Sequence, residues 1–129
     1  MRRMLEPAIH LACLCAAWCR LCDDYAPVLQ QVAGELIAAG VPLQCHWIDI
    51  EEEAELLGDV DVETFPTLVI ADAQQVRFAG PLAPQADTLR RVLRATVLDA
   101  ANGGSWPVVA APIEAFAQRL RHRRNERDR

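Results

Sequence analysis

The sequence contains no lysine, few aromatic residues and no apolar run long enough to cross a bilayer. All 13 of its basic residues are arginines, and aromatic side chains make up only 5% of the 129 residues. A membrane-spanning helix needs about 20 consecutive apolar residues, so we expect no membrane partner. The 18 acidic residues leave a net charge of −5. We therefore do not expect nucleic acid to be a partner, because such proteins carry an excess of basic charge.

The length and composition fit one globular domain with a hydrophobic core, since 52% of the residues are hydrophobic. The positive charge is concentrated at the C-terminal end, where residues 116–129 hold six of the arginines. Such an end is typical of a solvated, fraying helix. A docking element is the alternative.

The N-terminus resembles a secretory signal peptide, because two arginines precede the mostly apolar residues 8–17. Glu6 and Pro7 interrupt this pattern, and cleavage after residue 17 would leave Trp18 without the strand before it. We therefore expect the segment to be retained and the protein to be cytoplasmic. The five cysteines are an odd number, which argues against a structural disulfide framework.

The hydrophobic periodicity predicts an α/β fold with the order β-α-β-α-β-β-α and one more helix at the C-terminus. A helix joins the first two strands, so these should be parallel, whereas the last two should form a hairpin. A four-stranded mixed sheet with helices on both faces follows. The predicted strands are residues 8–16, 41–50, 67–71 and 76–79, and the predicted helices are 22–39, 51–57, 85–100 and one from Pro112.

Two segments account for the whole chain in this interpretation. Residues 1–101 form the α/β domain, and residues 102–129 form a linker and a basic amphipathic helix. The glutamates of residues 51–53 should occupy the first turn of their helix, where carboxylates favour the helix dipole.

The sequence Cys19-Arg20-Leu21-Cys22 follows a buried strand and opens a helix. Amide groups at the start of a helix lack internal partners and carry partial positive charge, which favours the thiolate form of Cys19. Arg20 adds a formal positive charge beside it. Residues three apart share a helix face, so the sulfur of Cys22 can reach that of Cys19. The pattern predicts attack by Cys19 on a substrate disulfide and resolution of the mixed disulfide by Cys22.

Trp18-Cys19-x-x-Cys22 resembles the active-site signature Trp-Cys-x-x-Cys of the thioredoxin family. Pro27 stands where thioredoxins carry a proline that kinks the same helix. Thr64-Phe65-Pro66-Thr67 resembles the cis-proline loop of the family, and Gly80 matches a family glycine. The resemblance covers roughly residues 8–100.

The resemblance implies a thioredoxin-like fold and a thiol–disulfide oxidoreductase that acts on protein disulfides, with an unidentified reductant and no cofactor. Cys19 and Cys22 would be catalytic. The Phe65–Pro66 bond would be cis and would pack against the two cysteines, and backbone groups beside Pro66 would pair with the substrate chain. Trp18 and Arg20 would support the site.

The sequence also departs from the thioredoxin pattern. Only seven residues precede the first predicted strand, so the extra N-terminal strand and helix of thioredoxins should be missing, and the last helix has no counterpart. Cys13 occupies the position of a buried aspartate of the family, and Trp47 aligns with the lysine that partners it. The proton relay is therefore missing or rebuilt. Arg20-Leu21 replaces the usual Gly-Pro, and we expect a more oxidising potential.

Two other functions remain open on the sequence alone. Cys13, Cys15, Cys19 and Cys22 could hold zinc or an iron–sulfur cluster. The first two, however, lie within a strand and are not expected to face Cys19. They and Cys45 are more simply small core residues. The other alternative is a non-catalytic module that binds a partner or senses redox state. His10, His46 and His122 suggest no ligand set.

Overall fold

The computed structural model describes residues 9–83, 85–98 and 108–127, and its centre is a four-stranded mixed sheet. The spatial order is β2-β1-β3-β4, with β1 parallel to β2 and antiparallel to β3, and with β3 and β4 forming a hairpin. These relationships confirm the predicted sheet. The strands are β1 (Ile9–Cys15), β2 (Leu43–Asp49), β3 (Thr67–Ala71) and β4 (Val76–Pro81).

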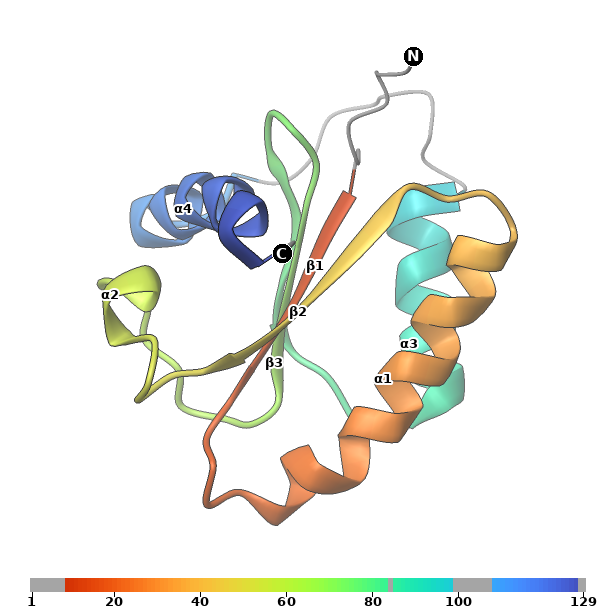
Figure 1. The fold of residues 1–129 in the computed structure, drawn as a ribbon, viewed down its shortest axis with the longest axis horizontal. Coiled ribbons are helices and arrows are strands. Elements are labelled where there is room, and N and C mark those ends of the chain that lie inside the picture. The colour runs from red at the N-terminus through yellow and green to blue at the C-terminus, as the bar shows by residue number, and fades with distance from the viewer. Residues whose placement is uncertain (1–8, 84, 99–107, 128–129) are drawn as a thin grey trace.

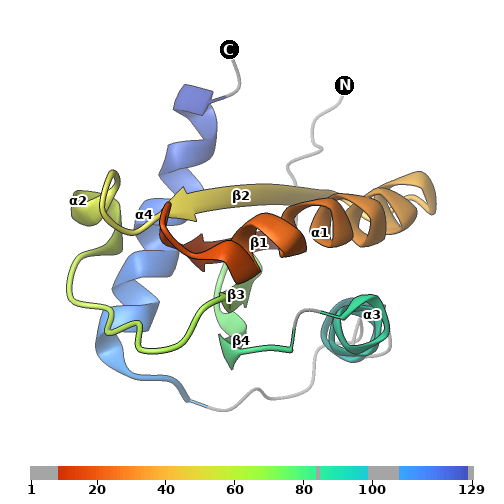
Figure 2. The ribbon, with the colours of Figure 1, turned by 90° about the horizontal axis from the view of Figure 1, so that it is seen from below.

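Helices cover both faces of this sheet (Figure 1). The view in Figure 2 separates the two layers, with α1 and α3 on one side of the sheet and α2 and α4 on the other. The helices are α1 (Arg20–Ala38), α2 (Ala54–Leu57), α3 (Ala86–Leu93) and α4 (Ala111–Arg127), and a π-helical turn, η1 (Arg94–Leu98), continues α3. The predicted linker and the predicted boundary after residue 101 lie outside the described residues. None of the helices in the described ranges has the length and hydropathy that a bilayer crossing requires.

Strand β1 is buried on both faces over all seven of its residues. Leu11, Cys13 and Cys15 face the core beneath α1 and α3, whereas Ala12 and Leu14 face the core beneath α4. A strand covered on both sides needs apolar side chains on both faces, which explains why every residue of β1 except His10 is apolar. The strand ends one short turn before α1, so the packing of β1 determines where α1 starts.

Helix α1 buries one stripe of side chains against the sheet, and the helix continues through the exposed Pro27. The stripe includes Tyr25, Leu29, Val32 and Leu36, which have the spacing of a helix face. Gly40 follows the helix with a φ of 97°, a backbone conformation that glycine adopts without strain.

Helix α2 is shorter than the sequence predicts, because the acidic run lies in a turn before it. One carboxylate oxygen of Asp49 accepts the backbone N–H of Glu51 at 2.8 Å and that of Glu52 at 3.1 Å. These bonds form an Asx-type turn that competes with helix formation. The prediction that residues 51–53 form the first helical turn is therefore wrong.

Helix α4 is part of the folded core. Phe116, Ala117 and Leu120 are fully buried against the sheet. Arg119 donates from Nε to the carbonyl of Leu56 at 2.7 Å and from Nη2 to that of Leu57 at 3.1 Å, so it caps the last carbonyls of α2. These contacts fix α2 and α4 together on one face.

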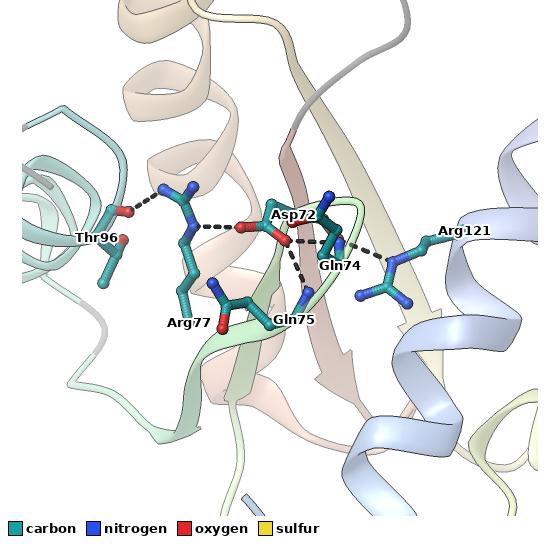
Figure 3. Close-up of polar contacts among 6 residues, drawn as sticks. All are labelled: Asp72, Gln74, Gln75, Arg77, Thr96 and Arg121. Carbon is teal, nitrogen blue, oxygen red and sulfur yellow. Dashed lines mark hydrogen bonds and ion pairs between the residues drawn. The ribbon is translucent and has the colours of Figure 1, made fainter. Parts of the chain in front are cut away.

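Asp72 joins the β3–β4 hairpin to the helices on both faces of the sheet (Figure 3). Its carboxylate accepts the backbone N–H groups of Gln74 and Gln75, each at 2.7 Å, and the Nε–H of Arg77 at 2.9 Å. Arg77 also donates to the carbonyl of Thr96 in η1 at 2.6 Å, and Arg121 of α4 donates to the carbonyl of Asp72 at 2.8 Å. The hairpin is therefore tied to elements that lie far away in the sequence.

We predict that Asp72→Ala lowers the free energy of unfolding by about 1–3 kcal/mol, because two turn amides and Arg77 lose a part-buried acceptor. Desolvation alone would raise the pKa of Asp72, but hydrogen bonds from the two amides and Arg77 hold it below the usual 3.8. The stabilisation is thus present at neutral pH and is lost as the pH falls through this lowered pKa. Urea unfolding of both proteins at several pH values measures the difference. It should shrink in acid, and Asp87→Ala, at an 85% exposed carboxylate, should be nearly neutral.

Tyr25 is the only tyrosine in the chain, so its titration reports on one position of the core. Its side chain is fully buried, and no group of the described residues hydrogen-bonds its hydroxyl. Burial raises the pKa of Tyr25 well above the usual 10.0. We predict that the tyrosinate absorbance of the folded protein stays absent near that pH and appears only with unfolding. The urea-unfolded chain should titrate at about pH 10. Tyrosinate in the folded protein at that pH would contradict the burial of Tyr25.

Candidate functional site

The predicted nucleophile, Cys19, lies at the junction between β1 and α1. It is the N-cap residue of α1, with an extended backbone (φ −91°, ψ 115°), and its N–H donates to the carbonyl of Ala16 at 3.0 Å. Its thiol is thus placed where the helix dipole favours negative charge. Cys19 is 9% exposed and Cys22 is 1% exposed. Cys19 is therefore the more exposed of the two residues.

The loop before β3 approaches the same junction. The Phe65–Pro66 peptide bond is cis, as the resemblance implied, and Pro66 is buried. The rings of Phe65 and Trp18 meet edge to face with their centroids 5.4 Å apart. Phe65 also packs against the core cluster that contains Cys19 and Cys22. The fold thus brings together the Trp-Cys-x-x-Cys segment and the proline loop, although 42 residues lie between Cys22 and Phe65 in the sequence.

Apolar side chains surround the junction on the outside. Trp18 is 66% exposed and Leu21 is 50% exposed, and Arg20 between the cysteines is exposed as well. Large exposed apolar side chains around a reactive group are typical of a surface that receives another protein. Arg20 supplies the only basic side chain in the four-residue motif.

Two further cysteines lie directly beneath the junction. The sulfur atoms of Cys13 and Cys15 are 3.5 Å apart, and both side chains belong to the core cluster that contains Cys19 and Cys22. The thiols of Cys15 and Cys19 lie near enough to that of Cys22 to raise the pKa of Cys22. Cys13 and Cys15 thus share one core cluster with the motif, and Cys15 is the one of the two whose thiol lies near that of Cys22. The odd-numbered residues of β1 point toward α1, and Cys15 ends the strand just below the first turn of that helix.

The surroundings of the inner thiols keep them protonated. Desolvation, followed by the hydrogen bonds with Cys15 and Cys19, raises the pKa of Cys22 above its usual value. The pKa of Cys15 is raised as well, first by its hydrogen bond with Cys13 and then by burial. In the described part of the chain the buried polar or charged side chains are those of His10, His46 and Thr96. No buried carboxylate is therefore available to these thiols there.

The register of β1 and β2 agrees with the expectation that the aspartate–lysine proton relay of the family is missing or rebuilt in this chain. Cys13, at the position of the family aspartate, lies opposite Trp47, at the position of the family lysine. Neither side chain can take up a proton from Cys22 in the way a carboxylate could.

Among the side chains outside the motif, Cys45 differs from its expectation, and two histidines form a pair that the sequence did not indicate. Cys45 is exposed on β2, so the prediction that it is a core residue is wrong. His10 and His46, which gave no sign of association in the sequence, lie in adjacent strands with Nδ1 of one 3.1 Å from Nε2 of the other. The register pairs Ala12 with His46 and so places position 10 diagonally across on the same face. Parallel pairing of the two strands was predicted, but the register was not.

The metal hypothesis gains no support from the geometry. Among the residues that the structure describes, no group of three or more histidine, cysteine or acidic side chains is arranged to hold a metal ion.

Comparison with solved structures shows the same fold in several thioredoxins. The germline-specific thioredoxin Deadhead of Drosophila melanogaster is 16% identical over 71% of this chain and 84% of its own, with a TM-score of 0.61. Fasciola hepatica thioredoxin is 18% identical over 70% and 83%, with a TM-score of 0.60. Mitochondrial thioredoxin 3 of Saccharomyces cerevisiae, in its oxidised form, is 19% identical over 70% and 80%, with a TM-score of 0.56.

No curated protein sequence is similar enough to this chain to be matched to it. The family model described as Thioredoxin matches residues 4–95. This match includes the Trp-Cys-x-x-Cys segment and the proline loop, and it supports a thioredoxin-like redox function. On this match and on its fold, the chain belongs to the thioredoxin family.

Proposed function

We propose that the protein is a thiol–disulfide oxidoreductase that acts on disulfides of other proteins through Cys19 and Cys22. The observation that carries this proposal is the arrangement of the two thiols at the start of α1. Cys19 is the N-cap residue and is more exposed than Cys22, and the buried thiol of Cys22 lies near that of Cys19. This arrangement places the attacking sulfur on the more exposed of the two residues and the resolving sulfur on the more deeply buried one.

The reaction consists of two exchange steps. The Cys19 thiolate attacks one sulfur of the substrate disulfide, a mixed disulfide forms, and the other substrate sulfur leaves as a thiolate. The sulfur of Cys22 then attacks Cys19, the mixed disulfide breaks, and the substrate leaves with both thiols reduced. The two electrons come from the Cys19–Cys22 pair, which an unidentified reductant must restore. The opposite direction oxidises a substrate dithiol.

The other site residues would bind and orient the substrate. Trp18 and Phe65 offer apolar contact area beside Cys19, and backbone groups next to Pro66 would pair with an extended substrate segment. Arg20 would favour the thiolate of Cys19, and a more oxidising potential than that of a typical thioredoxin stays a prediction.

The compartment we propose is the cytoplasm. The odd number of cysteines and the crowding of four of them around one site support a place where thiols are kept reduced. Crowded thiols would pair with one another in an oxidising compartment.

Substitution of the two catalytic cysteines should give different results. Cys19→Ser should abolish reduction of insulin disulfides, because no thiolate remains at the start of α1. Cys22→Ser should still attack but should stall as a mixed disulfide on Cys19, which mass spectrometry detects as an adduct. Cys45→Ser, at an exposed cysteine of β2, is the matched control and should keep full turnover. Turnover in Cys19→Ser would overturn the proposed mechanism, and a wild type without turnover or adduct would favour a non-catalytic module.

The resolution step should depend strongly on pH. Because burial and neighbouring thiols raise the pKa of Cys22 above 9.0, its thiolate fraction at neutral pH is smaller than that of an ordinary cysteine. The fraction grows about tenfold per pH unit below the pKa. We predict that release of substrate from the Cys19 mixed disulfide accelerates accordingly between neutral and alkaline pH, as stopped-flow single-turnover measurements can show. A rate independent of pH in this range would mean that another group deprotonates Cys22.

A further inference from the structure

We propose that Cys15 is a third redox-active cysteine, and that the disulfide on Cys22 exchanges from Cys19 to Cys15 inside the folded protein. This inference rests on the function proposed above, because the Cys19–Cys22 disulfide is its starting point. It adds a second, buried disulfide state to that site.

The thiols form a chain in which Cys22 is the branching member. The thiols of the more exposed Cys19 and of the buried Cys15 both lie near that of Cys22, in one core cluster. Cys15 and Cys22 are 2% and 1% exposed, so solvent and substrate do not reach either sulfur. Cys15 therefore lies closer to the Cys22 sulfur than any external thiol can, and exchange between them needs no molecule to enter the core.

Cys13 is not an equivalent partner, although its sulfur is 3.5 Å from that of Cys15. The two residues alternate on one extended strand, which separates their Cβ atoms by roughly 6–7 Å. A disulfide requires about 3.5–4.5 Å between Cβ atoms. A Cys13–Cys15 bond would therefore distort β1, whereas Cys15 and Cys22 come from different elements that converge. Cys13 acts instead as the hydrogen-bonding neighbour of Cys15.

The exchange leaves the oxidation state of the protein unchanged. The sulfur of Cys15 bonds to the sulfur of Cys22, the Cys19–Cys22 bond breaks, and Cys19 leaves with the electron pair. The proton released by Cys15 ends on Cys19, so one disulfide and one thiol are present before and after the step. The disulfide has moved from the surface into the core, and Cys19 is free again.

The direction of the exchange follows from the two environments. A thiol that is a weaker acid forms the more stable disulfide, and the thiol that is stabilised as an anion is the better leaving group. Cys15 has a raised pKa, whereas Cys19 leaves as a thiolate at the N-terminus of α1. The buried disulfide is therefore favoured at equilibrium, but it forms slowly at neutral pH because Cys15 is rarely ionised.

The buried state would change what the site does. A free Cys19 without a reduced Cys22 beneath it can still form a mixed disulfide, but no resolving thiol is left to release it. The protein in this state would hold a partner until Cys15–Cys22 is reduced.

Disulfide mapping of the Cys45→Ser protein tests the exchange. The reduced protein is treated with one equivalent of oxidised glutathione, incubated at several pH values, quenched with acid and alkylated with iodoacetamide. Chymotryptic cleavage after Leu14, Trp18 and Leu21 places each of the four clustered cysteines on its own peptide. We expect a Cys19–Cys22 link at early times and a Cys15–Cys22 link with alkylated Cys19 later. The conversion rate should rise about tenfold per pH unit.

Variants of Cys13 and Cys15 provide a second test of the exchange. Cys15→Ala should keep the Cys19–Cys22 link at all times, whereas Cys13→Ala should speed the conversion at neutral pH, because it removes the largest influence that raises the pKa of Cys15. Mapping of the unsubstituted cluster does not depend on these variants, so the outcome stands even if one of them fails to fold. A Cys19–Cys22 link that persists at every pH, with Cys15 alkylated, would overturn the inference and leave the proposed function intact. Failure to form any Cys19–Cys22 link would overturn both.

Discussion

The burial of β1 on both faces is the constraint from which the rest of the site follows. The strand lies second in the sheet, between β2 and β3, and helices cover it on each side. It cannot tilt or shift in register without exposing one core or the other. Its end at Cys15 therefore has a defined position, and the short turn that follows places Cys19 at the start of α1. The accessible sulfur and the buried ones are separated by this turn.

Helix α4 contributes to the same constraint from the opposite face. Its apolar side chains cover Ala12 and Leu14 of β1, and Arg121 ties it to the hairpin at Asp72. A sheet whose central strand is buried on both sides needs a cover on both sides. The helix thus supports the site without contributing a residue to it. Its apolar residues belong to the core, although the sequence of its C-terminal part is rich in arginine.

The features that were predictable from the sequence are the ones that short segments specify. The apolar run of β1, the helical stripe of α1 and the order of elements each depend on a local pattern, and the Trp-Cys-x-x-Cys segment identified the junction. The proximity of Cys15 to Cys22 could not be predicted, because every residue of β1 except His10 is apolar and such a strand gives little sign of which face meets which helix. The meeting of His10 with His46 depends on the register between two strands, and the exposure of Cys45 depends on its place in an edge strand.

The replacement of an acid by a thiol changes the electrostatics of the whole junction. An ionised carboxylate is costly to bury unless charged or hydrogen-bonding partners compensate it, whereas a neutral thiol is not. With Cys13 at the position of the family aspartate and Trp47 opposite it, the core beneath Cys22 needs no compensating charge. The described residues include no buried carboxylate that could ionise Cys22, and the thiols of Cys13 and Cys15 belong to the same core cluster as Cys22. The exchange that we propose between Cys19 and Cys15 would take place in this uncharged, sulfur-rich part of the core.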